Sequence, residues 1–209
     1  KKEGKEVMNK YYFEGKTQEQ AINLALYELN ISEDDLIVNN VEDKSSLLKK
    51  NVKIEVLNIK EIISFIKDTL NKITELMGAK SNLEVKRREK SISVTIFSEN
   101  NAILIGKNGK NVAALQLLIR QMVNSKLKEP LSIIIDVGNY KEKRARSIEY
   151  LAKKLAREAY KTKTEVTMDS MNSYERRIVH SALADDKYVY TESIGEEPNR
   201  KVVIKLKEE

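Results

Sequence analysis

Two glycines that enclose two polar residues form the most distinctive short pattern in the chain, Gly106-Lys107-Asn108-Gly109, and Lys110 follows it. Glycine adopts backbone angles that strain other residues, and it lets a ligand approach closely. Lys107 and Lys110 add positive charge. A helix beginning at Lys110 would also direct unpaired N–H groups toward the same place. This combination predicts a site that holds phosphate groups.

The spacing of the glycines distinguishes this loop from a nucleotide-binding P-loop. A Walker A motif needs four residues between its glycines and a Ser or Thr after the lysine. Here two residues intervene, and Asn111 follows Lys110. The apolar Ile103-Leu104-Ile105 also predicts a helix before the loop. The loop is therefore not that of a nucleotide hydrolase, but an ordinary helix–loop–helix with glycine caps remains an alternative.

Arg176 and His180 form a second candidate site. They are four residues apart in a segment expected to be helical, so they share one face. The planar guanidinium of arginine matches the geometry of phosphate, and a histidine ring nitrogen can donate a hydrogen bond in either charge state. The pair predicts a second phosphate contact, with an ordinary pair on a helix surface as the alternative.

A basic run, Lys86-Arg87-Arg88, ends an expected strand. At the edge of a sheet, these side chains would extend a positive track for a polyanion. A solvated run of charge explains them equally well, so both interpretations stay open.

The distribution of charge favours the same part of the chain. The 209 residues carry a net charge of +6. Residues 1–58 hold 9 basic and 11 acidic residues, for a net charge of −2. Residues 59–140 hold 13 and 8, and residues 141–209 hold 16 and 13, so their net charges are +5 and +3. A basic surface binds polyanions through counterion release, although a solvated basic surface is also consistent with these numbers.

The composition argues against catalysis. Because the chain has no cysteine and one histidine, thiol chemistry, zinc–thiolate sites and a His-centred triad are not expected. The adjacent pairs Asp34-Asp35 and Asp185-Asp186 diverge in direction and resemble turn residues more than a metal site. We therefore expect no enzyme activity, no metal and no cofactor.

No apolar run approaches about 20 residues, and residues 1–10 lack a secretory pattern, so the expected location is cytoplasmic.

Hydrophobic periodicity predicts three small α/β modules in series, an α+β fold. The expected domains are residues 1–57, 58–139 and 140–209. The expected helices cover residues 17–29, 59–77, 100–105, 110–126 and 141–160, with a further helix starting at 172. The expected strands cover residues 9–15, 36–41, 52–56, 82–88, 92–96, 131–137, 165–168, 188–193 and 201–206. The helix at 110–126 is apolar nearly all round and is expected to be well buried.

The middle module resembles a type II KH domain in the order of its elements and in its Gly-x-x-Gly loop. This resemblance implies a loop that clamps the backbone of single-stranded nucleic acid. It also implies an adjacent apolar groove for bases, with Ile103, Ile105 and Val112 in its floor. The same three residues are equally good core residues.

The whole chain resembles the Jag family, also called SpoIIIJ-associated or KhpB/EloR proteins, which combine a Jag N-terminal domain, a type II KH domain and an R-x-x-x-H domain. The segment Gly195-Glu196-Glu197-Pro198-Asn199-Arg200 resembles a hairpin of this family. Two features depart from the family pattern. Lys44–Lys50 replaces a Gly-Phe-Leu-Gly-type segment, and Ser173 stands where proline is frequent.

The resemblance implies a bacterial RNA-binding regulator of cell elongation, division or sporulation that acts without catalysis. The implied partners are single-stranded RNA or single-stranded DNA, a small stand-alone KH protein, a second copy of the chain, and a nearby membrane insertase. An alternative is a protein-interaction scaffold in which the KH fold mainly dimerises and contact with nucleic acid is incidental.

Overall fold

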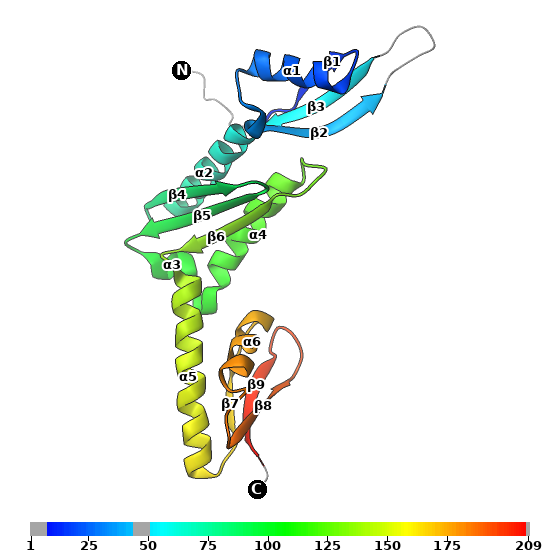
Figure 1. Cartoon of the computed structure of the whole chain (residues 1–209). Coiled ribbons are helices and arrows are strands. Elements are labelled where there is room, and N and C mark those ends of the chain that lie inside the picture. Colours follow the sequence, from blue (N-terminus) through cyan, green and yellow to red (C-terminus); the bar gives the residue numbers. More distant parts are fainter. Residues whose placement is uncertain (1–7, 44–50, 208–209) are drawn as a thin grey trace. The chain divides into compact units, whose positions relative to one another are not determined.

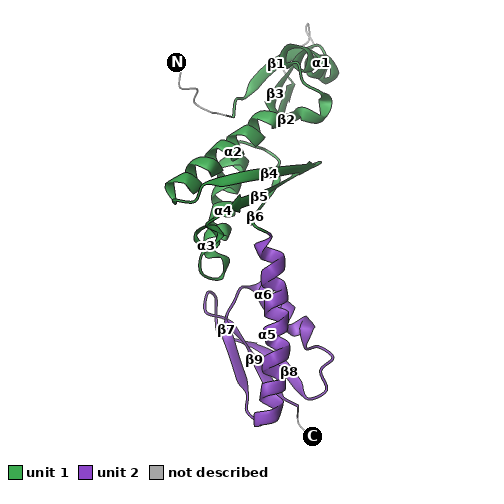
Figure 2. Ribbon diagram, turned by 90° about the vertical axis from the view of Figure 1, so that its left-hand side faces the viewer, with its two compact units in different colours: residues 1–138 green, residues 139–209 purple. Residues whose placement is uncertain are grey.

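The computed structural model describes residues 8–43 and 51–207, which belong to two compact units, residues 1–138 and 139–209 (Figures 1 and 2). Mixed helices and three separate three-stranded sheets confirm the α+β class and the series of three modules. Two of the sheets lie in the first unit, and the exact domain boundaries stay a prediction. The Lys44–Lys50 segment lies outside the described residues.

The first module places one helix on an antiparallel sheet of order β1-β3-β2. Its elements are β1 Tyr11–Gly15, α1 Gln18–Leu29, a 3-10 turn Glu33–Asp35, β2 Leu36–Asp43 and β3 Val52–Asn58. Helix α1 begins where predicted, because the Thr17 hydroxyl accepts a hydrogen bond from the Gln20 N–H at 3.2 Å. It ends at Asn30, which adopts the left-handed conformation.

The second module is built on the sheet β4-β5-β6, with α2 and α4 on one face (Figure 1). Its elements are α2 Ile59–Leu76, β4 Ser81–Arg88, β5 Ser91–Ser98, α3 Asn101–Ile105, a 3-10 turn Lys107–Gly109, α4 Lys110–Asn124 and β6 Ser132–Val137. Strands β4 and β5 are antiparallel, whereas β5 and β6 are parallel. A parallel pair needs a crossover, and α3, the glycine loop and α4 provide it.

Helix α4 is not buried all round, which corrects the expectation. Its buried residues lie on one face, namely Val112, Leu115, Ile119 and Val123. Leu118 is 47% exposed, and Leu117 and Met122 are exposed as well. The helix packs on a sheet on one side only, so its remaining apolar side chains face solvent.

The second unit packs two helices on a sheet of order β7-β9-β8. Its elements are α5 Tyr140–Thr162, β7 Val166–Ser170, α6 Ser173–Ala182, β8 Val189–Ile194 and β9 Lys201–Leu206. A capping box begins α6 where a helix was predicted to start, since the side chain of Asn172 accepts from the Glu175 N–H and that of Glu175 accepts from the Asn172 N–H. Ser173 is the first residue of α6. None of the helices in the described part of the chain is long and apolar enough to span a membrane.

Candidate nucleic-acid interface

The glycine loop adopts a conformation that depends on its residue types. Gly106 has φ 68° and Gly109 has φ 77°, and Asn108 is also left-handed with φ 53°. Asparagine tolerates this region better than most residues, so the loop forms one tight turn between α3 and α4. The side chains of Lys107, Asn108 and Lys110 are exposed. Within the described residues neither lysine forms an ion pair, so their charges are free to meet an anion.

Asn111 holds the two sides of the loop together. Its Nδ2 donates to the carbonyl oxygen of Ile103 at 2.8 Å, which ties the start of α4 to α3. A Cβ added to Gly106 would lie 2.5 Å from Asn111 Cγ. Glycine at position 106 is therefore required both by the backbone angle and by this close approach.

The three residues expected to line an apolar groove have different environments. Ile103 is 45% exposed and Ile105 is partly buried, whereas Val112 is only 3% exposed and lies in the core. Val112 lies on the face of α4 that packs inward, as the alternative of a core residue implies. The groove assigned to Ile103, Ile105 and Val112 stays a prediction.

The flank of α4 next to β6 carries residues that the motifs do not indicate. Gln116 marks this flank, because its Oε1 accepts from the backbone N–H of Ile135 at 3.1 Å. Arg120 lies one turn further along the same side and is exposed, as is Leu117 beside Gln116. The helix predicted to follow the glycine loop includes Arg120. Its position on that helix could have identified Arg120 as a candidate cation from the sequence.

The basic run on β4 splits between two faces. Lys86 and Arg88 are exposed on the open face of the sheet, and Lys86 pairs with Glu84 at 3.0 Å. Arg87 points to the other face, where its Nη1 donates to Asp35 Oδ1 at 2.7 Å. It also donates to the carbonyl oxygen of Asp34. Of the three, Lys86 and Arg88 lie where an added ligand could reach them, and Arg87 is held by the first module.

Asp35 connects the first two modules. It accepts hydrogen bonds from Lys60 Nζ at 2.7 Å, from Arg87 at 2.7 Å and from Ser32 Oγ at 2.8 Å. These donors, Lys60 first, lower the pKa of the Asp35 carboxyl from 3.8 to about 2. A second contact joins the same two modules, where Asn39 Oδ1 accepts from the backbone N–H of Lys128 at 2.6 Å.

Arg176 is a buried side chain in the second unit. It is 7% exposed, its Nη1 donates to the carbonyl oxygen of Met171 at 2.7 Å, and its Nη2 pairs with Glu197 at 2.8 Å. Glu197 lies in the turn between β8 and β9. Arg176 therefore holds the start of α6 against the β8–β9 turn, and its guanidinium already has a carboxylate where a phosphate contact was predicted.

His180 lies between two hydroxyls of β8. Its Nδ1 is 2.6 Å from Thr191 Oγ1, and its Nε2 is 2.8 Å from Ser193 Oγ. Burial lowers the pKa of His180 below 6.5, and the positive charges of Arg176 and Arg200 lower it further. A neutral ring can serve both hydroxyls, one nitrogen donating and the other accepting.

We expect the His180 pKa, measured by NMR titration of its ring protons, to lie below 6.5. The second unit should then lose stability as the pH falls from about 6.5 toward the folded-state pKa, because the unfolded chain takes up the proton first. The same titration in concentrated urea provides the control, since the unfolded ring should titrate near its ordinary value. A folded-state midpoint at or above that control would contradict the role of burial.

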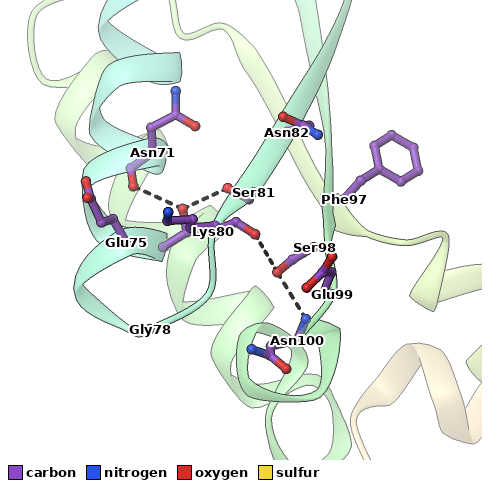
Figure 3. A pocket seen from close by; sticks show the side chains of 11 residues that line it. Asn71, Glu75, Gly78, Lys80, Ser81, Asn82, Phe97, Ser98, Glu99 and Asn100 are labelled. Atoms are coloured by element: carbon purple, nitrogen blue, oxygen red, sulfur yellow. Dashed lines mark hydrogen bonds between the residues drawn. The ribbon is translucent and has the colours of Figure 1, made fainter.

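A hollow of about 940 Å³ lies where α2 ends beside strands β4 and β5 (Figure 3). It is lined by Asn71, Thr74, Glu75, Gly78, Lys80, Ser81, Asn82, Phe97, Ser98, Glu99 and Asn100. The Thr74 and Ser81 hydroxyls are 2.8 Å apart, and Ser98 Oγ donates to the Lys80 carbonyl oxygen at 2.7 Å. The first bond joins the end of α2 to β4, and the second joins β5 to the residue that precedes β4, so both hold the wall of the hollow together.

Comparison with known proteins places each module in a family. The Jag N-terminus model matches residues 13–57, and the KhpA/KhpB KH domain model matches residues 64–135. The model of the R-x-x-x-H domain, the domain named for its Arg and His, matches residues 146–206. The RNA-binding protein KhpB of Clostridium symbiosum is 36% identical over 206 residues, which cover 93% of this chain and 90% of that protein. The chain belongs to the Jag (KhpB) family.

Two further relatives support this membership. The RNA-binding protein KhpB of Bacillus subtilis is 30% identical over 200 residues, covering 92% of this chain and 96% of that protein. The RNA-binding protein KhpB of Streptococcus pneumoniae is 27% identical over 199 residues, covering 95% of this chain and 58% of that protein. The similarity to Jag-family proteins thus extends over all three modules.

Proposed function

We propose that this chain binds single-stranded RNA, with the Gly106–Gly109 loop as the principal contact. The observation that carries the proposal is the loop geometry, in which left-handed backbone at Gly106, Asn108 and Gly109 leaves Lys107 and Lys110 exposed and unpaired within the described residues. The N-terminus of α4, which has no side-chain cap, directs the positive end of its helix dipole to the same place. The printed names of the relatives, RNA-binding proteins, favour RNA as the polyanion.

Other exposed side chains of the same module provide further contacts to RNA in this proposal. Ile103 offers apolar surface beside the loop, and Lys86, Arg88 and Arg120 add exposed positive charge in the same module. Arg176 and His180 act as positioning residues in this proposal, because their polar atoms are already bonded within the second unit. They would contact phosphate only if RNA replaced Glu197 or the β8 hydroxyls.

The family resemblance extends the proposal to a cytoplasmic regulator of cell elongation, division or sporulation that works by binding rather than catalysis. Single-stranded DNA is the competing ligand, because an exposed phosphate clamp does not itself distinguish the two sugars. Proximity to a membrane insertase is part of the same family-based proposal.

Changing Lys107 and Asn108 both to Asp tests the loop. Two negative charges would then face phosphate, and two contacts of about 1 kcal/mol each would be lost, so RNA affinity should fall about thirtyfold. Aspartate tolerates the left-handed region, so the loop should keep its conformation. Binding of a single-stranded RNA would be measured by fluorescence anisotropy over a range of salt concentrations.

The matched control is the pair Asn71→Asp and Lys72→Asp on α2, because both residues are exposed and the total charge change is the same. RNA affinity that falls equally in both variants would show a general effect of net charge. Unchanged affinity in the loop variant, with the fold intact, would refute the assignment of this loop.

A second candidate function is contact with another KH protein or a second copy of this chain. The exposed apolar side chains of α4 favour it, in particular Leu118 and Met122. If this were the main function, the loop variant would keep its protein partner, and the chain would show no appreciable salt-dependent affinity for RNA.

A further inference from the structure

Helix α5 holds an unusual concentration of positive charge. Among its residues, Tyr140–Thr162, eight are Lys or Arg and three are Glu, for a net charge of +5. The whole chain has a net charge of +6. Neither the glycine loop nor the Arg176/His180 pair lies on this helix, so the charge is not accounted for by the sites described above.

Four of these eight cations share one face of the helix. The buried residues of α5 are Ile148, Ala152, Ala156 and Ala159, which pack in the core of the second unit. The opposite face carries Lys143, Tyr150, Lys154, Arg157 and Lys161, all exposed. We call these five residues the α5 basic row. Their spacing of seven, four, three and four residues keeps them in line along the helix axis.

Acidic residues do not neutralise this row. Glu142 pairs with Arg146 at 2.5 Å, and Glu149 pairs with Lys153 at 2.6 Å, both beside the row. The remaining acid, Glu158, forms no ion pair with Lys154 one turn earlier among the interactions of the described residues. The four cations of the row therefore have no partner in the part of the chain that the structure describes.

This arrangement is unfavourable for the isolated helix. Lys154 and Arg157 are three residues apart, and Arg157 and Lys161 are four apart, so like charges repel across successive turns. An external polyanion would remove this repulsion. The row runs about 27 Å from Lys143 to Lys161, long enough to follow about eight phosphates of a stacked strand.

We propose that the α5 basic row is a second RNA-binding surface, which contacts the phosphate backbone of a single strand. Tyr150, 73% exposed in the middle of the row, offers its ring to a base. This inference rests on the proposed RNA-binding function. An anionic membrane is the less favoured partner, because a membrane-surface helix inserts an apolar face and that of α5 is packed in the core.

The test compares two variants of the full chain that lose the same charge. The row variant changes Lys143, Lys154, Arg157 and Lys161 to Gln. The control changes four exposed lysines elsewhere to Gln, namely Lys16, Lys67, Lys72 and Lys187. Affinity for a single-stranded RNA of about 30 nucleotides is measured against salt. If all four cations contact phosphate, the slope of log affinity against log salt should become shallower by about 2.8 in the row variant.

The expected result is a loss of affinity of about tenfold or more in the row variant and a smaller change in the control. Equal slopes in the two variants would overturn the inference. The loop variant with Lys107→Asp and Asn108→Asp is measured alongside, so a weakened loop variant with an unaffected row variant would reject only the row.

If the unmodified chain binds no RNA, the proposed function and the row both fail. Row-dependent binding to phosphatidylglycerol vesicles with unchanged RNA affinity would assign the row to a membrane surface instead.

Discussion

Replacing Arg176 by Ala is expected to destabilise the second unit by about 4 kcal/mol. The substitution removes a buried guanidinium that donates to the Met171 carbonyl oxygen and pairs with Glu197. It leaves that carbonyl without its donor and opens a space beside α6. A buried carbonyl left without its donor costs about 1–3 kcal/mol, and truncation of a large buried side chain to Ala typically adds about 2 kcal/mol or more for the cavity.

Hydrogen exchange of the α6 and β9 amides in the full chain would measure this loss, because it reports the second unit separately from the first. The matched control is Glu197→Gln, which removes the carboxylate but keeps the Met171 contact. Glu197 is 58% exposed, so that variant should lose less than about 1 kcal/mol. Equal losses in both variants would contradict the structural role of the buried guanidinium.

Replacing Asp35 by Ala should cost the first unit about 3 kcal/mol and loosen the contact between its two sheets. Asp35 accepts from Lys60, Arg87 and Ser32, and two of these donors belong to the second module. Hydrogen bonds to a charged group contribute about 1.5–3 kcal/mol each, but Lys60 is largely exposed and so adds less. Urea unfolding, with hydrogen exchange of the β2 and β4 amides, would measure both effects.

Asp34→Ala is the matched control, because Asp34 is the neighbouring carboxylate and its side chain is exposed. The Arg87 contact to residue 34 uses the backbone oxygen and survives that change.

The pH dependence of stability gives a further check. Because the folded-state pKa of Asp35 is lowered from 3.8 to about 2, its stabilisation is present above about pH 4 and is lost as the pH falls toward 2. A D35A variant with unaltered acid sensitivity would contradict this role.

If Asp35 acts in this way, it also affects the proposed RNA surface. Arg87 lies in the basic run of β4, yet its guanidinium is held by the first module. Lys86 and Arg88, on the other face of the same strand, stay exposed. The Jag N-terminal module therefore takes one cation of the run for a structural contact and leaves two available for a ligand.

Most of the local structure follows from signals in the amino-acid sequence. Capping residues set the starts of helices, as with Thr17 for α1 and Asn172 with Glu175 for α6. Alternating Ile92, Val94 and Ile96 predicted β5, and all three are buried. The glycine spacing predicted a loop between two helices at residues 106–109. These signals are local, because each depends on contacts within a few residues of the chain.

The charged residues that a ligand can reach depend on contacts between distant parts of the chain. Arg87 meets Asp35 across 52 positions of sequence, and Arg176 meets Glu197 because the β8–β9 turn returns to the start of α6. The sequence pattern assigned both arginines to phosphate, since a motif shows residue type and spacing but not the partner brought by folding.

The α5 basic row is the opposite case. Its residues appear as scattered charges in the sequence, and burial of the alanine face leaves them together on the solvent side.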